Sequence, residues 1–287
     1  MGMKVLVTGV TGQLGFDVVR ELERRGVECR GVGRAEFSLT DIAAMRACLT
    51  QYAPDAVIHC AAYTAVDRAE DEPELCQQVN AAATEAMARV CHDIGAKMVY
   101  ISTDYVFPGT GTDCYEPDDP KAPQNVYGAS KLAGEQAVQA VLAEAFIVRI
   151  SWVFGIHGKN FIRTMLRLAE THDHLTVVAD QIGSPTYTVD LARLLVDMAG
   201  SEAYGVYHAT NEGVCSWAEF AQEIFRQSGR RVQVEPVDSA AYPTRAVRPK
   251  NSRMSKACLD RAGFARLPAW QDALRRYLQE LSAEKAH

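Results

Sequence analysis

The chain has 287 residues, 48% of them hydrophobic and 23% charged, which is typical of a globular protein with one large domain or two fused ones. No stretch approaches the roughly 18 consecutive apolar residues of a membrane helix, and the net charge of −6 argues against a nucleic-acid partner. The eight cysteines form no C-x-x-C pair, which favours reduced thiols over a zinc site or disulfides. Because we find no signal peptide, we expect a cytoplasmic protein without a membrane partner.

Strand-like and helix-like segments alternate in the first half of the chain. A β-branched run at 4–8 precedes helical spacing from Phe16 to Arg24. Further buried strands are predicted at 56–60, 98–102 and 146–150, with helices at 74–94 and 128–143 between them. Strands and helices that alternate in this way predict an α/β fold with a doubly wound parallel sheet of the Rossmann type.

The pattern is looser beyond residue 150. It predicts a helix at 161–170, a strand at 175–179, a helix at 190–199 and a short strand at 205–208. No low-complexity linker or internal repeat separates this half from the first. We therefore expect a second, smaller C-terminal α/β lobe packed against the sheet.

A glycine-rich turn follows the first strand and opens the first helix, with Gly9, Gly12 and Gly15 at three-residue intervals. In this context glycines let the backbone approach a pyrophosphate, and the helix N-terminus favours that anion. At the end of the next strand, where an acid would bind the ribose of NAD, the chain has Arg34. A cation there can receive a 2′-phosphate, so the sequence favours NADPH over NADH. The alternative for Arg34 is a solvated side chain.

Tyr127 and Lys131 lie four residues apart at the start of a predicted helix, so their side chains leave the same face. We expect the Lys131 ammonium to lower the pKa of Tyr127 and make it a proton donor to a developing alkoxide. A Tyr-x-x-x-Lys pair is common on helix surfaces by chance. Thr103, at the end of the strand 98–102, adds weight because its hydroxyl could hold a substrate carbonyl in the same crevice.

These residues resemble the extended short-chain dehydrogenase/reductase family, and more closely the dTDP-4-dehydrorhamnose reductases within it. The resemblance covers nearly the whole chain and rests on the segments 12–15, 59–67, 102–107, 151–154, 160–161, 180–186 and 248–249, together with Asn80. It implies reduction of the 4-keto group of dTDP-4-dehydro-L-rhamnose by NADPH or NADH, in dTDP-rhamnose biosynthesis for cell-wall polysaccharide. It also implies a NAD(P)-binding domain at 1–150, to which segments near 175–210 return, and a mainly substrate-binding lobe at 151–287.

The resemblance also assigns roles to single residues. Tyr127 would donate the proton, and Lys131 would bind the nicotinamide ribose and tune Tyr127. Thr103, Asp104 and Trp152 would contact the sugar. The cofactor contacts that it implies, together with those expected from the glycine turn and Arg34, fall on Gly9, Gly12, Gln13, Leu14, Gly15, Arg34, Ser38, Leu39, Ala62, Tyr63, Thr64, Tyr127 and Lys131. Ser38 departs from the aspartate that family members often have near the adenine.

Two further expectations concern a metal and an assembly. Some members of the family bind magnesium at a dimer interface through acidic residues, so the resemblance allows a homodimer. The matching positions hold Asp17 and Asp190 but not the full acidic set, and we therefore expect no required metal. We interpret Asp17 as a carboxylate near a helix N-terminus, where the dipole favours it.

The densest basic segment outside the first domain is Arg245, Arg248, Lys250 and Arg253. We expect a loop here, in which Arg248 binds the diphosphate of the nucleotide sugar; the alternative is a solvated turn. The next candidates for that role are Lys159, Arg163 and Arg167. By contrast, we expect Trp217 and Phe220 to pack in the core, on the apolar face of a helix that Ser216 begins.

Other functions remain open on the sequence. An epimerase with tightly bound NAD would need the same tyrosine, although the order Ser102-Thr103-Asp104-Tyr105 resembles the reductases. A catalytically silent regulatory subunit is the alternative from a different class, and intact Thr103, Tyr127 and Lys131 count against it. A dehydratase would have an acid where the chain has Tyr105.

Overall fold

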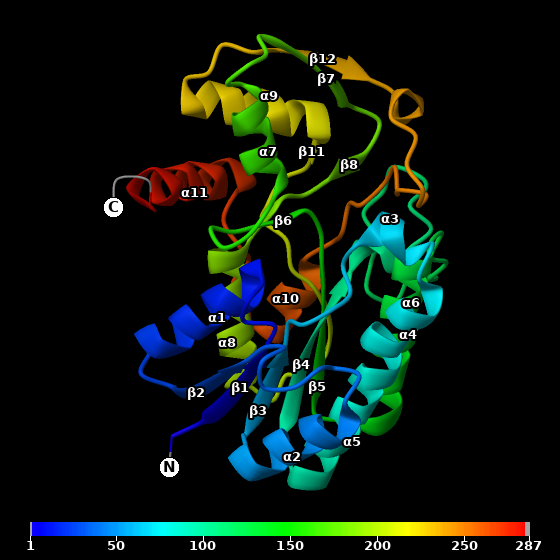
Figure 1. The fold of residues 1–287 in the computed structure, drawn as a ribbon, viewed down its shortest axis with the longest axis vertical. Coiled ribbons are helices and arrows are strands. Elements are labelled where there is room, and N and C mark those ends of the chain that lie inside the picture. The colour runs from blue at the N-terminus through cyan, green and yellow to red at the C-terminus, as the bar shows by residue number, and fades with distance from the viewer. Residues whose placement is uncertain (1, 285–287) are drawn as a thin grey trace.

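A computed structural model describes residues 2–284, and its centre is one sheet of six parallel strands in the order β10-β5-β4-β3-β1-β2 (Figure 1). Strands and helices alternate along the first half of the chain, so the predicted α/β fold with a doubly wound parallel sheet is confirmed. The strands are β1 (Lys4–Thr8), β2 (Glu28–Val32), β3 (Ala56–His59), β4 (Lys97–Thr103), β5 (Ala145–Ile150) and β10 (Gly205–His208).

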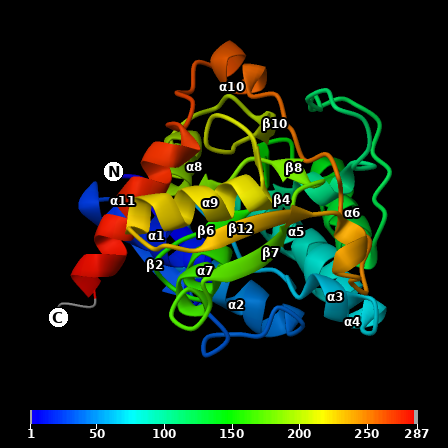
Figure 2. The same ribbon diagram turned by 90° about the horizontal axis from the view of Figure 1, so that it is seen from above.

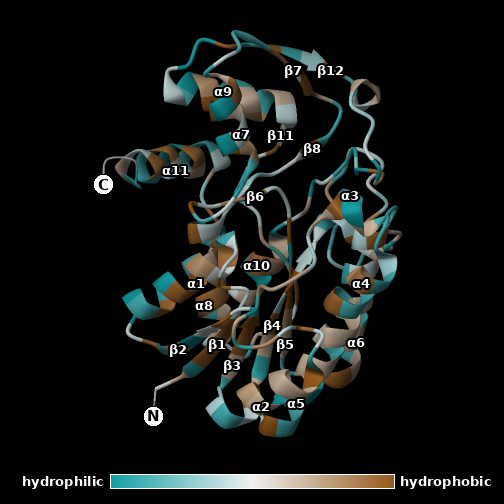
Figure 3. Cartoon of the chain, in the orientation of Figure 1, coloured by the Kyte–Doolittle hydropathy of each residue, from teal (hydrophilic) through white to brown (hydrophobic). Residues whose placement is uncertain are grey.

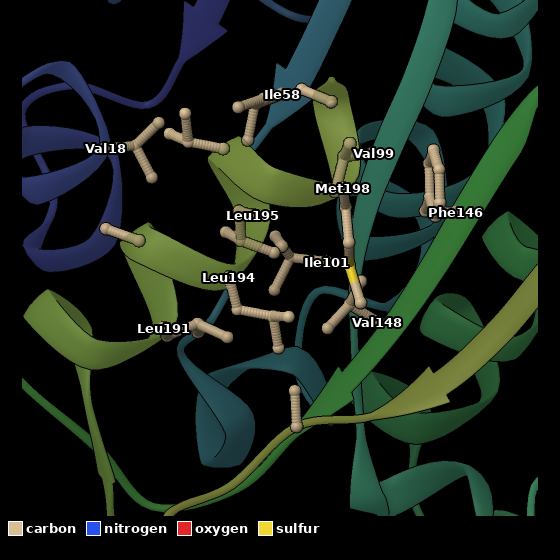
Figure 4. Close-up of a cluster of buried hydrophobic side chains, with 14 of the residues drawn as sticks. Val18, Ile58, Val99, Ile101, Phe146, Val148, Leu191, Leu194, Leu195 and Met198 are labelled. Carbon is tan, nitrogen blue, oxygen red and sulfur yellow. The ribbon is translucent and has the colours of Figure 1, made fainter. Parts of the chain in front are cut away.

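Both faces of the sheet are covered by helices, because successive side chains of a strand point to opposite faces. Val5 and Val7 of β1 belong to the cluster under α1 (Gln13–Arg24) and α8 (Thr188–Ala199). Leu6 belongs to the opposite cluster, under α2 (Ile42–Tyr52), α5 (Ala83–Ile94) and α6 (Val126–Val141). Figure 4 shows leucines of α8 against Ile58, Val99, Ile101 and Val148 of the central strands. The residues 188–208 thus complete the sheet and one of its helical layers.

The helix predicted at 74–94 is interrupted. It consists of α4 (Pro73–Gln77), a π-helical turn (Gln78–Ala82) and α5. π-turns occur at functional sites because the extra residue redirects a side chain. Here the turn contains Asn80, whose fully buried side chain reaches the loop after β3. Sequence periodicity does not register one inserted residue in an otherwise helical segment.

A smaller lobe lies beyond the carboxyl ends of the strands, at the top of Figure 1 and over the sheet in Figure 2. Its core is rich in aromatic side chains. A two-stranded parallel ladder and two shorter strand pairs link its segments. Its helices are α7 (Phe161–Leu168), α9 (Trp217–Ser228) and α11 (Trp270–Glu284), and its strands are β6 (Val153–Phe154), β7 (His174–Val178), β8 (Ile182–Gly183), β9 (Thr186–Tyr187), β11 (Cys215–Ser216) and β12 (Gln233–Val237).

Short elements connect these layers. A helix α3 (Val66–Ala69) follows the loop after β3, a 3-10 turn (Asp104–Val106) follows β4, and α10 (Ala257–Ala262) precedes α11. All eight cysteines are free. Within residues 2–284, none of the helices has the length and apolar character needed to span a membrane.

Candidate active site

A cavity of about 1030 Å³ lies at the carboxyl edge of the sheet. Because β1 lies between β2 and β3, the chain changes direction across the sheet here, and doubly wound sheets bind ligands at such a switch point. The predicted site residues that line the cavity are Gly9, Gly12, Gln13, Leu14, Gly15, Arg34, Ser38, Leu39, Ala62, Tyr63, Thr64, Thr103, Asp104, Tyr127, Lys131 and Trp152. Arg248 is not among them.

The glycine turn after β1 packs so closely against neighbouring backbone that it has no room for side chains at Gly9 and Gly15. Gly9 has a φ of +73°, and a Cβ there would lie 2.7 Å from the backbone nitrogen of Ala61. A Cβ on Gly15 would collide with the carbonyl oxygen of Gly9. The helix α1 begins after Gly12 without a side-chain cap, so its first N–H groups remain for a ligand. This cradle fits the pyrophosphate of a dinucleotide.

The cavity continues past the end of β2 toward residues predicted to hold the adenosine half of the cofactor. Arg34 is exposed at the cavity rim. The carboxylate of Glu36 accepts a hydrogen bond from the backbone nitrogen of Gly33 at 2.6 Å. Ser38 contacts the Thr40 hydroxyl at 2.8 Å rather than a charged group. A cation at this rim is compatible with a 2′-phosphate.

Three predicted catalytic side chains meet at the middle of the cavity. Thr103 is the last residue of β4, and its hydroxyl donates a hydrogen bond to the Asp104 carboxylate at 3.0 Å. Tyr127 lies in the first turn of α6, which Asn125 caps by accepting a hydrogen bond from Gly128 at 2.7 Å. Lys131 follows one turn later and is buried. The end of a strand and the start of a helix thus bring together a hydroxyl, a phenol and an amine.

Burial controls the pKa values of these groups. It lowers the pKa of Lys131 to about 7, against the opposing charge of Glu135. It raises the pKa of Tyr127 above its ordinary value, and the Asp104 carboxylate adds to that shift. The pKa of Tyr127 therefore does not fall as predicted, because desolvation of the phenolate is the largest cause of its shift. Tyr127 stays protonated at neutral pH and can act as an acid.

A buried ionic network lies behind these residues. The Glu135 carboxylate accepts two hydrogen bonds from Arg149, at 2.9 and 2.7 Å, and one from the Ser102 hydroxyl at 2.5 Å. Arg149 also donates to the carbonyl of Pro117 at 2.9 Å. Glu135 lies one turn after Lys131 on α6, so the network fixes the helix that holds the catalytic pair.

Asn80 fixes the loop after β3. Its side-chain oxygen accepts a hydrogen bond from the backbone nitrogen of Tyr63 at 2.8 Å, and its amide donates to the Tyr63 carbonyl at 3.0 Å and to Ser130 at 2.9 Å. The Tyr63 hydroxyl donates to Glu72 at 2.7 Å. The loop that lines the cavity is thereby tied to α6.

Arg248 lies beside the cavity, and its assignment to the substrate diphosphate stays a prediction. Its guanidinium donates to Asp67 at 2.6 Å and, at 3.2 Å, to the hydroxyl of Tyr105, which lines the cavity. Nearby, Ser252 donates to the Asp104 carboxylate at 2.5 Å. The Arg248 guanidinium thus pairs with a carboxylate and with a phenol at the cavity wall. Of the other candidates for the diphosphate, Lys159 lines the cavity, whereas Arg163 bonds the Ile156 carbonyl at 2.6 Å.

The expectation of core packing holds for Phe220, which is fully buried, and in part for Trp217, which is half-buried and packs against the same core cluster. Trp217 lines the cavity and stacks on Trp152, with ring centroids 3.7 Å apart and planes inclined by 13°. Sequence reasoning missed this residue because its helical spacing is the same as that of a core residue. Only the approach of two segments 65 positions apart along the chain brings the indoles together.

A loop of the smaller lobe also reaches the glycine turn. Gln13 accepts hydrogen bonds from the Gly155 nitrogen at 2.9 Å and the Asn160 amide at 3.1 Å. His157 stacks on Phe16 of α1 with centroids 4.5 Å apart, and it lines the cavity. No local sequence pattern indicates these contacts.

Asp17 and Asp190 are engaged by other side chains. Asp17 lies in the second turn of α1, accepts hydrogen bonds from Thr188 at 2.5 Å and Arg20 at 2.9 Å, and is buried. It is thus an interhelix contact rather than the first-turn carboxylate expected from the sequence. Asp190 pairs with Arg276 at 2.6 Å. Among the described residues, no group of three or more His, Cys, Asp or Glu side chains could hold a metal.

The chain resembles known proteins over nearly its whole length. Residues 3–283 match the model of the family described as the RmlD substrate binding domain. The chain is 42% identical over 280 residues to the spore coat polysaccharide biosynthesis protein SpsK of Bacillus subtilis, covering 98% of both. It is 42% identical over 276 residues to a dTDP-4-dehydrorhamnose reductase of Streptomyces griseus, covering 94% of this chain and 91% of the relative. The crystal structure of dTDP-4-dehydrorhamnose reductase from Bacillus anthracis in complex with NADP has a TM-score of 0.95 at 41% identity, covering 98% of this chain and 100% of that one.

Proposed function

The chain belongs to the RmlD substrate binding domain family, and from that premise we propose that it reduces the 4-keto group of dTDP-4-dehydro-L-rhamnose to give dTDP-L-rhamnose, with NADPH as the reductant. The observation that carries the proposal is the meeting of Thr103, Tyr127 and Lys131 in the same cavity as the glycine turn. Full-length identity of 42% to a dTDP-4-dehydrorhamnose reductase supports the substrate, and the NADP complex of a relative supports the cofactor.

The residues of the chain would act on the carbonyl oxygen of the sugar. When bound, NADPH supplies the hydride that adds to C4. The Thr103 hydroxyl donates a hydrogen bond to the carbonyl oxygen, and the Tyr127 phenol gives that oxygen its proton as negative charge develops. Because burial keeps Tyr127 protonated, it is ready to act as the acid in this direction of the reaction.

Two further side chains would orient the ligands. Lys131, buried on the same face of α6 as Tyr127, would donate hydrogen bonds to the nicotinamide ribose. Asp104 would accept a hydroxyl of the sugar. Its burial raises its pKa to about 6, so that the carboxylate is ionised at neutral pH but not far below it.

The same proposal assigns cofactor binding and substrate binding to different halves of the chain. We assign residues 1–150 to the NAD(P)-binding domain, with segments near 175–210 returning to it, and residues 151–287 mainly to substrate binding. The glycine turn and Arg34 in the first part, and Trp152 in the second, support this division. We place the reaction in the cytoplasm, where NADPH and nucleotide sugars are made, and we propose a homodimer, which light scattering tests.

Product analysis tests the function. The purified chain is incubated with NADPH and dTDP-4-dehydro-L-rhamnose, and the loss of NADPH absorbance is compared with the product identified by NMR. We expect equimolar NADPH oxidation and dTDP-L-rhamnose formation, and no oxidation with dTDP-D-glucose, which has no keto group. An isomerised sugar without net NADPH oxidation would indicate an epimerase, and an inert but folded chain would indicate a regulatory subunit.

A further inference from the structure

Trp152 has an unusual backbone conformation at one end of the cavity. It follows β5 by two residues, and its φ of +49° lies in the left-handed region, which bulky side chains rarely adopt. Such a conformation persists only where surrounding contacts hold it, and it is common at functional sites. The side chain of Trp152 also stacks on Trp217. Trp152 is therefore held in place by its environment and not by local preference.

Two contacts confine the Trp152 indole. Trp217 stacks on it in nearly parallel planes. The backbone of Gly183 in β8 is also close, because a Cβ built there would lie 2.9 Å from Cε2 of Trp152. A residue larger than glycine at position 183 would displace the indole.

Trp217 is itself fixed by hydrogen bonds. It is the first residue of α9, and the cap of that helix is reciprocal: Ser216 accepts from the Glu219 nitrogen at 3.1 Å, and Glu219 accepts from the Ser216 nitrogen at 2.7 Å. The indole nitrogen of Trp217 donates to Gln181 at 3.2 Å, and Gln181 donates to Ser239 at 3.0 Å. The smaller lobe thus presents Trp217 at a defined place and angle.

We propose that Trp217 is a positioning residue, which holds the Trp152 indole so that the apolar face of the deoxyhexose is bound with its keto carbon toward Tyr127. This inference rests on the proposed function. Aromatic rings bind the C–H faces of sugars through burial of apolar surface. Because both indoles line the cavity that also contains Thr103 and Tyr127, the stacked pair forms part of the cavity wall contributed by the smaller lobe.

The test compares substitutions of the three tryptophans of the chain. Trp217→Ala should raise both the KM for the keto sugar and the calorimetric Kd for dTDP-L-rhamnose about tenfold, with NADPH affinity unchanged. Trp217→Phe should recover most of the loss, because a phenyl ring can still stack on Trp152. Trp270→Phe is the matched control. Trp270 lies buried in the same lobe, its indole nitrogen has no hydrogen-bond partner in the described chain, and it does not line this cavity.

Circular dichroism separates positioning from general loss of structure. Two indoles stacked at this distance couple their excitations, so the wild type should show a couplet that Trp152→Phe and Trp217→Phe abolish and Trp270→Phe retains. Unchanged sugar affinity in Trp217→Ala, with the couplet lost, would overturn the inference. So would a couplet that persists in Trp217→Phe. The calorimetric measurement needs no turnover. A wild type that binds the sugar nucleotide without reducing the keto sugar would therefore reject the proposed function. The comparison of Trp217 variants would still test the positioning role, because it measures binding.

Discussion

The sheet edge and the smaller lobe build their parts of the cavity in different ways. Around the sheet, the core is mainly aliphatic, and functional residues directly follow the strands or begin α6. Figure 3 shows apolar residues along the central strands, whereas α11 of the smaller lobe alternates between apolar and polar positions. The core of that lobe is aromatic and is assembled from segments far apart in sequence. The catalytic residues, which belong to short sequence motifs, therefore lie at the sheet edge. The smaller lobe contributes a cavity wall that depends on contacts between residues far apart in sequence.

The largest expected effect tests whether the sheet edge depends on its buried ion pair. Arg149→Met leaves the Glu135 carboxylate buried without its partner, and the free energy of unfolding should fall by about 3–5 kcal/mol. Urea unfolding measures the change. The double variant Arg149→Met/Glu135→Leu should recover most of it, because no unpaired charge remains. Equal stability of the single variant and the wild type would contradict the role of the pair.

The next effect concerns catalysis at the same edge. Tyr127→Phe removes the phenol that donates the proton and leaves packing against Tyr105, a T-shaped contact at 5.6 Å, nearly unchanged. Turnover should fall about 100-fold or more, the range for loss of a general acid. Steady-state kinetics measure the effect, and thermal unfolding checks that the variant is folded. Near-normal turnover in a folded variant would remove Tyr127 from the mechanism.

A smaller effect is expected for the preference between NADPH and NADH, which depends on the cavity rim after β2. Arg34→Ala should weaken NADPH binding by roughly 1.5–3 kcal/mol and leave NADH binding nearly unchanged, because only NADPH has the 2′-phosphate. Fluorescence titration of both cofactors measures the difference. Arg30→Ala is the matched control, since Arg30 lies in β2 over the Tyr52 ring and outside the cavity lining. An equal loss for the two cofactors would mean that Arg34 acts through structure.

The smallest effect concerns the smaller lobe. Ser216→Ala removes the side-chain half of the cap of α9, and the free energy of unfolding should fall by about 1 kcal/mol. Asp41→Ala, which removes the cap of α2 beneath the sheet, gives the matched value for the other region. Urea unfolding of both variants shows whether the two regions unfold together. A loss above that of Arg149→Met would contradict the expectation that the buried ion pair contributes more to stability than the cap of α9.

The α/β fold, the glycine turn and the catalytic residues of the cavity could be predicted from the sequence, because their signals are local. Alternation of strand and helix periods defines the parallel sheet, and the carboxyl ends of parallel strands meet at one edge. Gly9, Thr103 and Tyr127 could thus be placed near one another without coordinates, and all three line the cavity. The α9 helix beginning at Ser216 was predictable for the same reason, from its capping residue.

Only the tertiary structure decided how far burial shifts the pKa values in the site and which side chains from distant segments meet there. The pKa of Tyr127 rises because the folded chain removes water from the phenol, a quantity that residue spacing does not contain. Arg248 bonds Asp67 and Tyr105, which lie 181 and 143 residues before it, because the fold brings its loop against them, and at such separations sequence carries no distance information. Trp217 meets Trp152 for the same reason, since helical periodicity defines the apolar face of α9 but not the segment that this face contacts.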